Sequence, residues 1–198
     1  CIVAKSPGSI VCVSSKSKYK TLDDLVEASK KDNVTFAANA GATTYVMGAM
    51  LNEAGAEFNL VDMGGAADRI PALMGGQCDA IANALGSAGQ YLESGDFRAL
   101  ALLEDERNEN YPDIPTAKEL GYNASFPMYY FFAFPKGTDS EIVEKLADAC
   151  EEIANMEEVQ KAQFDSYAQS PFFAKGEEAE TIESDQLKTV EALKDVLE

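Results

Sequence analysis

The chain has 198 residues and a mass of 21.3 kDa, which is enough for one or two domains with a sizeable core. Its 46% hydrophobic and 25% charged residues are typical of globular proteins and exclude a largely disordered or fibrous chain. Sixteen Lys and Arg residues against 34 Asp and Glu residues give a net charge of −18, so nucleic acid and anionic lipid are not expected partners.

Histidine is absent, which excludes Ser-His-Asp and Cys-His nucleophilic sites and His-ligated zinc within this chain. The four cysteines, Cys1, Cys12, Cys78 and Cys150, lie far apart in the sequence and form no C-x-x-C pair. We therefore expect buried free thiols, and neither a metal site nor a cofactor.

No run of about 18 or more apolar residues is present, so no segment is predicted to cross a bilayer. The sequence also contains no signal-peptide pattern. A lipoprotein cysteine normally precedes a polar tether, but Cys1 is followed by the apolar Ile2, Val3 and Ala4. We therefore expect Cys1 to mark a domain boundary or the cut end of a longer chain.

The first half of the chain alternates short β-branched runs with helical segments. Strands are expected at residues 10–14, 34–38, 58–62, 78–82 and 98–103. Helices are expected at residues 21 to about 31, from about 45 to 54, after 65 through 74, and at 90–93. Thr21 and Asp24 form a capping-box pattern, Gly55 is placed to end the second helix, and Pro71 disfavours the third unless it lies in the first turn. Strands separated by such helices predict right-handed βαβ units and a mostly parallel sheet.

The second half is richer in helices. After a charged loop at 104–110, a short helix capped by Thr116 is expected. Residues 128–134 are the most aromatic segment and are expected to form a buried strand rather than a platform that stacks on bases. Three further helices are expected, from about 138 to 154, at roughly 157–168 and at roughly 177–197.

Two loops of the predicted sheet have the features of anion-binding sites. In an open parallel sheet, ligands bind beyond the carboxyl ends of the strands. In the first loop, Gly41 allows close approach of the backbone, while the hydroxyls of Thr43 and Thr44 and the exposed amides can bind a carboxylate or phosphate. Residues 63–67 repeat this arrangement after the next strand. In proteins generally, one such loop taken alone is more often a tight turn with a helix N-cap than an anion-binding site.

Known nucleotide and nucleophile motifs are absent. The chain contains neither a P-loop nor a dinucleotide fingerprint, and residues 86–89 lack the spacing of a nucleophile elbow. Arg69 and Arg98 could pair with an anionic ligand, although surface ion pairs are the commoner role of arginine.

Residues 72–80, Ala-Leu-Met-Gly-Gly-Gln-Cys-Asp-Ala, resemble a signature of the substrate receptors of tripartite tricarboxylate transporters, the TctC or Bug family. Further segments resemble the family in the same order, at residues 19–25, 40–43, 94–101, 112–116 and 134–138. The resemblance runs from about residue 19 to residue 154, and the combination is much more specific than any one segment.

The resemblance implies a fold like that of type II periplasmic binding proteins, in which two α/β lobes close over a small carboxylate. It implies a ligand site made of Gly41, Ala42, Thr43, Thr44, Gly64, Gly65, Ala66 and Asn83. Asp79 belongs to the signature but is expected to end a buried strand, so its role is read as mostly structural.

The resemblance also implies a division of the chain. Residues 1–135 would form the second α/β lobe, and residues 136–198 the C-terminal helices that return to the first lobe. The family's first-lobe segment, which precedes the second lobe, has no counterpart in this sequence. The C-terminal helices would then expose an apolar patch, so we expect self-association, as a homodimer.

Two departures from the family concern the identity of the ligand. The family usually has a histidine a few residues after the clamp loop, and this chain has none. The aromatic strand, where the family often has tryptophan, reads Tyr-Tyr-Phe-Phe at residues 129–132.

We expect an α/β binding module that captures a small di- or tricarboxylate, or an amino acid, at the periplasmic or extracellular face of the cytoplasmic membrane. It would deliver this ligand to membrane transporter subunits without an enzymatic reaction. Amide dipoles can bind an anion despite the net charge of −18, because salt screens fields beyond about 8 Å.

Two other function classes stay open. One is the effector-sensing domain of a transcription regulator, which shares the fold and would need a helix-turn-helix before residue 1. The other is an enzyme that uses carboxylates and Mg²⁺, for which the sequence offers no paired-acid motif.

Overall fold

The computed structural model describes residues 1–194, and the chain divides into two compact units. The sheet unit comprises Gly8–Phe126 and the end of the chain from Val190. The helical unit comprises Cys1–Pro7 and Pro127–Thr189. Among the described helices, none has the length and apolar character needed to cross a membrane.

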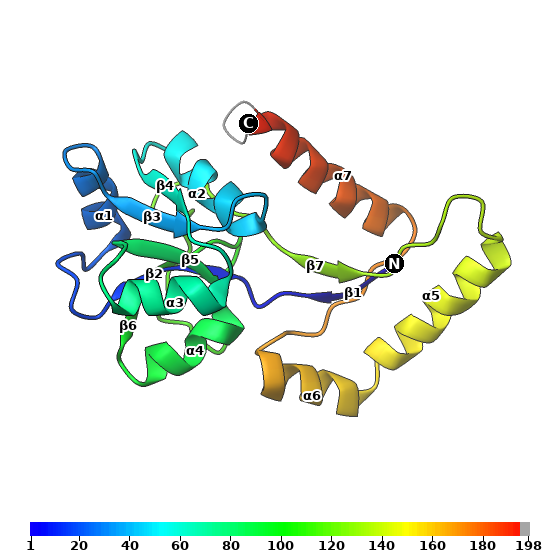
Figure 1. The fold of residues 1–198 in the computed structure, drawn as a ribbon. Helices are drawn as coiled ribbons and strands as arrows, with labels where there is room; N and C mark the ends of the chain where they lie inside the picture. The colour runs from blue at the N-terminus through cyan, green and yellow to red at the C-terminus, as the bar shows by residue number, and fades with distance from the viewer. Residues whose placement is uncertain (195–198) are drawn as a thin grey trace. The chain divides into compact units, whose positions relative to one another are not determined.

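The sheet unit is built on a five-stranded sheet with the order β4-β3-β5-β2-β6 (Figure 1). Its strands are β2 (Ser9–Ser14), β3 (Thr35–Ala38), β4 (Asn59–Asp62), β5 (Ala80–Ala84) and β6 (Phe97–Leu102). β3 runs parallel to β4 and β5, whereas β2 runs antiparallel to both β5 and β6. Four strands therefore point the same way and β2 opposes them, which agrees with the predicted mostly parallel sheet.

Helices α1 (Leu22–Ser29) and α2 (Thr43–Glu53) have the ends that the sequence predicts. The Thr21 hydroxyl accepts from the Asp24 amide at 3.1 Å, and the Asp24 carboxylate accepts from the Thr21 amide at 3.1 Å. This reciprocal capping box confirms the prediction at α1. Gly55 follows the end of α2 with φ +104°, a conformation that favours glycine.

Helix α3 (Ala66–Met74) contains Pro71 in its interior. Pro71 is the sixth helical residue, so it does not lie in the first turn as the sequence argument required. The helix continues past it because Ile70, Ala72 and Leu73 are buried against the sheet, and this packing offsets the missing backbone donor.

Helix α4 (Leu85–Glu93) begins five residues earlier than predicted. The glycines and serine at residues 86–89 have low helix propensity, which is why the sequence indicated a loop there. Burial of Leu85, Ala88 and Gly89 overrides that propensity. A Cβ at Gly89 would lie 2.6 Å from the Tyr111 hydroxyl, so the absent side chain lets the helix approach that ring.

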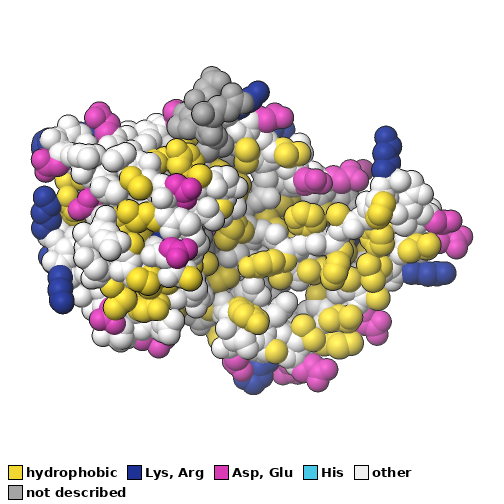
Figure 2. Space-filling model, in the orientation of Figure 1, with side chains coloured by type: hydrophobic (Ala, Val, Ile, Leu, Met, Phe, Trp, Pro, Cys, Tyr) yellow, Lys and Arg dark blue, Asp and Glu magenta, His cyan; other side chains and the backbone are white. Residues whose placement is uncertain are grey.

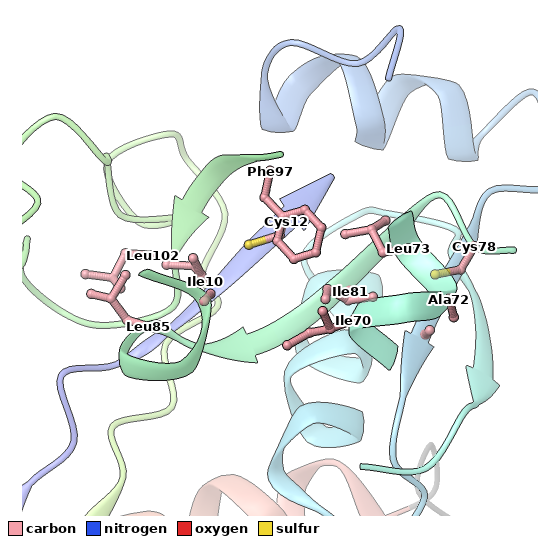
Figure 3. Packing of buried hydrophobic residues seen from close by; sticks show 12 residues of the cluster. Ile10, Cys12, Ile70, Ala72, Leu73, Cys78, Ile81, Leu85, Phe97 and Leu102 are labelled. Atoms are coloured by element: carbon pink, nitrogen blue, oxygen red, sulfur yellow. The ribbon is translucent and has the colours of Figure 1, made fainter. Parts of the chain in front are cut away.

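Alternate residues of the strands separate the two faces of the sheet. Ile10, Cys12 and Ile81 pack with residues of α3 and α4 in one buried cluster, shown in Figure 3. Phe36 faces the other side, where its ring stacks on Phe58 at 5.3 Å and where α2 crosses. The sheet is therefore covered on both faces.

The helical unit consists of a two-stranded antiparallel sheet and helices. Its elements are β1 (Ile2–Lys5), β7 (Tyr129–Phe131), α5 (Ser140–Ala154), α6 (Glu157–Tyr167) and the part of α7 (Glu177–Ala192) up to Thr189. Asp139 caps α5 by accepting from the Glu141 amide at 2.8 Å. The three predicted helices are confirmed, although the predicted end of the last one, near residue 197, lies outside the described residues.

The predicted buried aromatic strand is wrong. β7 has only three residues, and Tyr130, Phe131 and Phe132 are 53%, 67% and 51% exposed. A run of aromatic residues indicated a core strand, but a strand in a two-stranded sheet has one partner and little to bury its faces.

The short helix predicted after Thr116 is a turn. Thr116 and Glu119 exchange the two hydrogen bonds of a capping box, at 2.8 and 3.1 Å. However, the amide of Ala117 donates to the carbonyl of Leu102 at 2.8 Å, which ties this segment to β6 instead of letting a helix continue.

The cysteines are free thiols, as predicted. Cys12, Cys78 and Cys150 are buried and Cys1 is half-buried. Burial, the largest cause, raises the pKa of Cys78 to about 11, so this thiol is unreactive near neutral pH.

Candidate functional site

Three loops meet at one edge of the sheet. Because β3, β4 and β5 are parallel, their carboxyl ends lie at the same edge, and each leads into a helix. The structure brings all eight predicted ligand residues to this edge, on the β3–α2 loop, the β4–α3 loop and the end of β5. We call this edge the clamp edge.

The β3–α2 loop begins the first part of the clamp edge. Gly41 is exposed and has φ +76°, and Ala42 is the N-cap of α2. Thr43 is the first residue of the helix and is half-buried. The Thr44 hydroxyl oxygen accepts from the Asn39 amide at 3.1 Å, so this side chain holds the loop closed.

The β4–α3 loop is joined to the first loop by Asp62, which the sequence argument did not select. One carboxylate oxygen of Asp62 accepts from the Gly64 amide at 3.1 Å and from the Ala40 amide at 3.2 Å. These two amides, together with the charge of Arg69, lower the pKa of Asp62 below its usual value. The carboxylate therefore stays ionised and fixes one loop against the other.

Asn83 lies within β5, not beyond it as the sequence suggested, and is 1% exposed. Its Oδ1 accepts from Nη2 of Arg69 at 3.5 Å, and its Nδ2 donates to the Ser87 hydroxyl at 3.1 Å. Arg69, on α3, also donates through Nη1 to the carbonyl of Gly64. A continuous set of polar contacts thus links the β4–α3 loop, β5 and α4.

The helices that start at the clamp edge have no side-chain caps. None of the N-cap residues Ala42, Gly65 and Ala84 can cap α2, α3 or α4 through its side chain. By contrast, α1 of the same unit has a full capping box at Thr21. Free amide donors and the positive ends of three helix dipoles are what a bound anion requires.

The opposite edge of the sheet carries structural residues. The Asp79 carboxylate accepts from the Thr35 amide at 2.9 Å and joins the starts of β3 and β5. Asp79 precedes β5 rather than ending a strand as predicted, but the hydrogen bond agrees with the structural role assigned to it. Arg98 also lies at this edge, where it donates to the carbonyls of Tyr19 and Ser15 at 3.1 and 3.0 Å.

Two members of the contact network were missed by sequence reasoning, and one was ranked low. Asp62 is the last residue of its strand and is followed by Gly-Gly, a signal that could have marked it as a loop anchor. Ser87 was considered only as part of a nucleophile motif, and Arg69 only as a secondary candidate. Among the described residues, no three His, Cys, Asp or Glu side chains lie close enough together to hold a metal ion.

The family described as tripartite tricarboxylate transporter family receptor, TctC, matches residues 2–195. Among individual proteins, the chain is 30% identical over 139 residues to the protein BugT of Bordetella pertussis, covering 68% of this chain and 43% of BugT. The chain spans less than half the length of the curated relatives it matches.

Two solved structures have the same fold. The Rhodopseudomonas palustris protein Rpa4515, determined with adipate, superposes with a TM-score of 0.84 at 17% identity, over 99% of this chain and 67% of that one. MatC from the same species, with bound malate, superposes with a TM-score of 0.78 at 21% identity, over 100% of this chain and 69% of that one. These likenesses confirm the predicted α/β fold class.

The match along nearly the whole described chain, together with this fold, confirms the family resemblance that the sequence shows. The chain belongs to the receptor family of tripartite tricarboxylate transporters, TctC.

Proposed function

We propose that this chain is the ligand-binding part of an extracytoplasmic solute-binding protein, which captures a small carboxylate for a tripartite tricarboxylate-type transporter. The observation that carries the proposal is the clamp edge, where three uncapped helix N-termini meet on loops tied together by Asp62 and Arg69. Such an arrangement binds a carboxylate through neutral donors and performs no reaction.

The groups proposed to contact the ligand are the amides of the two clamp loops, with the buried Asn83, held by Arg69 and Ser87, next to them. Gly41 and Gly64, with φ +76° and +69°, let the backbone turn at the positions where the loops leave their strands. The adipate and malate that accompany the two related structures support a ligand with one or more carboxylates.

Family membership supports the location and the partners that we propose. The protein would work at the periplasmic or extracellular face of the cytoplasmic membrane and pass its ligand to the membrane subunits of the transporter. Within the two-lobe fold, residues 1–135 would belong to the second lobe and residues 136–198 would return to the first.

Titration calorimetry of the full chain tests the proposal. Malate, adipate, citrate, succinate and glutamate are titrated separately, with 1,5-diaminopentane, a dication without a carboxylate, as the control. We expect heat of binding from one or more of the acids and none from the diamine. Absence of binding with all five acids contradicts the proposed function of this chain.

We also propose that the chain associates with a second copy through the helical unit. Hydrophobic side chains gather over β1 and β7 and on the adjoining helices, as Figure 2 shows. Ile2, Tyr129, Phe131, Val143 and Ile182 contribute to a groove of about 390 Å³ within this unit. Exposed apolar surface of this kind is typical of protein interfaces.

A further inference from the structure

Arg69 is a buried arginine whose acidic neighbours, Asp62 and Asp68, act on it through space without a direct ion pair. Its side chain lies on α3 within the sheet unit and is only 4% exposed. Among residues 1–194 it forms no ion pair, and its Nε has no hydrogen-bond partner. Burying a charge without a direct ion pair is costly, so the structure holds at the clamp edge a cation to which a bound carboxylate would add a direct counter-ion.

The two bonds that the guanidinium does form both engage oxygen acceptors of the clamp edge. Nη1 donates to the Gly64 carbonyl, and Nη2 donates to Oδ1 of Asn83 at 3.5 Å. The carbonyl and the amide hydrogen of a trans peptide point in opposite directions. With the Gly64 carbonyl turned to Arg69, the Gly65 amide therefore points away from it, and this amide has no acceptor among the described residues.

The same contact orients Asn83. Its oxygen is held by Arg69, so its nitrogen faces Ser87 on α4 and donates to the Ser87 hydroxyl. Arg69 thus keeps two oxygens occupied at an edge where the starts of α2, α3 and α4 supply amide donors. An anion therefore meets hydrogen-bond donors and a positive charge there. The N–H groups of a neutral amide would need acceptors, and the Gly64 and Asn83 oxygens already accept from Arg69.

We propose that Arg69 is a positioning residue that makes the clamp edge selective for ionised carboxylates over their uncharged amides. It does so by holding the Gly64 and Asn83 oxygens and by adding to the acidic clamp edge a positive charge that favours an ionised ligand. This inference rests on the proposed function and names the feature that sets its ligand class.

Arg98 provides a matched comparison within the same unit. It too donates to two oxygens, the carbonyls of Tyr19 and Ser15, but at the opposite edge of the sheet. The change Arg98→Gln removes the same charge and the same kind of contacts as Arg69→Gln, away from the clamp edge. A general effect of losing an arginine would appear in both variants.

The test compares each acid with its diamide of equal length, adipate with adipamide and malate with malamide. Calorimetry is performed on the unaltered chain and on Arg69→Gln, Arg69→Lys and Arg98→Gln, and thermal unfolding verifies that each variant is folded. The unaltered chain is expected to prefer the acid strongly. In Arg69→Gln we expect acid binding about 10- to 100-fold weaker with diamide binding little changed, because a hydrogen bond or charge at a buried site has about this effect.

Arg69→Lys keeps the charge and is expected to retain more of the acid preference than Arg69→Gln. If the glutamine variant does not fold, the lysine variant alone is compared with the unaltered chain. Arg98→Gln is expected to bind like the unaltered chain. Unchanged acid binding in both Arg69 variants, or an equal loss of acid and diamide binding, overturns the inference and leaves the proposed function standing. Failure of the unaltered chain to bind any acid contradicts the proposed function and removes the inference with it.

Discussion

Asp62 connects two loops that are 22 residues apart through the amides of Ala40 and Gly64. Its contribution to stability depends on its charge. Because the pKa of Asp62 in the folded chain is below the ordinary value of 3.8, this contribution is complete above that value and is lost as the pH falls through the lower, folded value. The loops should therefore loosen in acid.

The change Asp62→Asn removes the charge and keeps the shape of the side chain. We expect the variant to be less stable than the unaltered chain at pH 7, and the difference to shrink below about pH 3.8. Urea unfolding at pH 7, 4 and 3 measures the free energy of unfolding of both proteins. Asp113→Asn, at an exposed aspartate, is the control. A difference that stays constant from pH 7 to pH 3 would show that the charge of Asp62 does not stabilise the loops.

Gly64 and Gly65 are adjacent, but only one of the two positions requires glycine. Gly64 has φ +69°, and a Cβ there would lie 2.9 Å from Oδ2 of Asp68. Gly65 has φ −75°, and a Cβ there would meet nothing within 4 Å. Glycine is therefore needed at the first position and not at the second.

Gly64→Ala is expected to lower the free energy of unfolding by about 1–2 kcal/mol, the usual cost of a left-handed conformation for a residue with a Cβ. Gly65→Ala is expected to change it by less than about 0.5 kcal/mol. Chemical denaturation of the two variants side by side makes the comparison. Equal effects at both positions would mean that the backbone of the β4–α3 loop relaxes on substitution.

At the residue scale, the sequence predicts the backbone segments of the proposed site but not the side chains that hold them. Gly41, Thr43 and Gly64 could be selected because small and hydroxyl residues follow predicted strands. Asp62 could not, and Arg69 could be selected only as a general partner for an anion, because their contacts with Ala40 and Asn83 form only in the folded sheet. The same holds for Thr44, whose hydroxyl is used by its own loop.

Helices α2, α3 and α4 begin at the clamp edge without side-chain caps. The first amide of α4, that of Leu85, donates to the Gly8 carbonyl at 2.9 Å, so the first residues of α2 and α3 are the most direct probes of anion binding. Proline is well tolerated at the first helical position, where it removes one amide donor without breaking the helix. Thr43 and Ala66 occupy that position in α2 and α3, and the N-caps before them have the extended backbone that a following proline prefers.

Thr43→Pro and Ala66→Pro should each weaken carboxylate binding, because each deletes an amide donor of the clamp edge. A lost hydrogen bond to a charged group corresponds to about 1.5–3 kcal/mol, or roughly 10- to 100-fold in affinity. Ser140→Pro is the matched control, since Ser140 is the first residue of α5, after extended Asp139. Calorimetry with adipate measures all three. Full affinity in both clamp variants would place the ligand elsewhere.

Elements were predictable where local chemistry decides them. The capping box at Thr21 places α1 correctly, and short β-branched and apolar runs place β2, β3, β4 and β6 within about two residues. The predictions for α4 and for the aromatic segment were wrong because tertiary contacts determine both. In α4, Gly89 allows close packing against Tyr111, and β7 is exposed because it pairs only with β1. Thr116 shows the intermediate case, in which the capping contacts form but pairing with β6 prevents a helix.

At the scale of the whole molecule, the net charge of −18 and the exposed apolar residues of the helical unit act in opposite directions. Like charge keeps copies of the chain apart, and salt screens this repulsion at separations beyond about 8–10 Å at physiological ionic strength. Burial of apolar side chains such as Phe131 favours association and depends little on salt. Self-association should therefore increase as the ionic strength rises.

Multi-angle light scattering across a range of protein concentrations, at about 0.05 and 0.5 M salt, tests this balance. We expect the mass to rise from that of one chain toward that of two, and to do so at lower protein concentration in high salt. Phe131→Ser, with a side chain 67% exposed, should reduce association without unfolding the chain, whereas Met74→Ser, exposed on α3 of the sheet unit, should not. A mass of one chain under every condition would show that the helical unit does not bind a second copy. Association that weakens with salt would instead mean that charged groups hold the copies together, against the apolar contact argued from Phe131 and its neighbours.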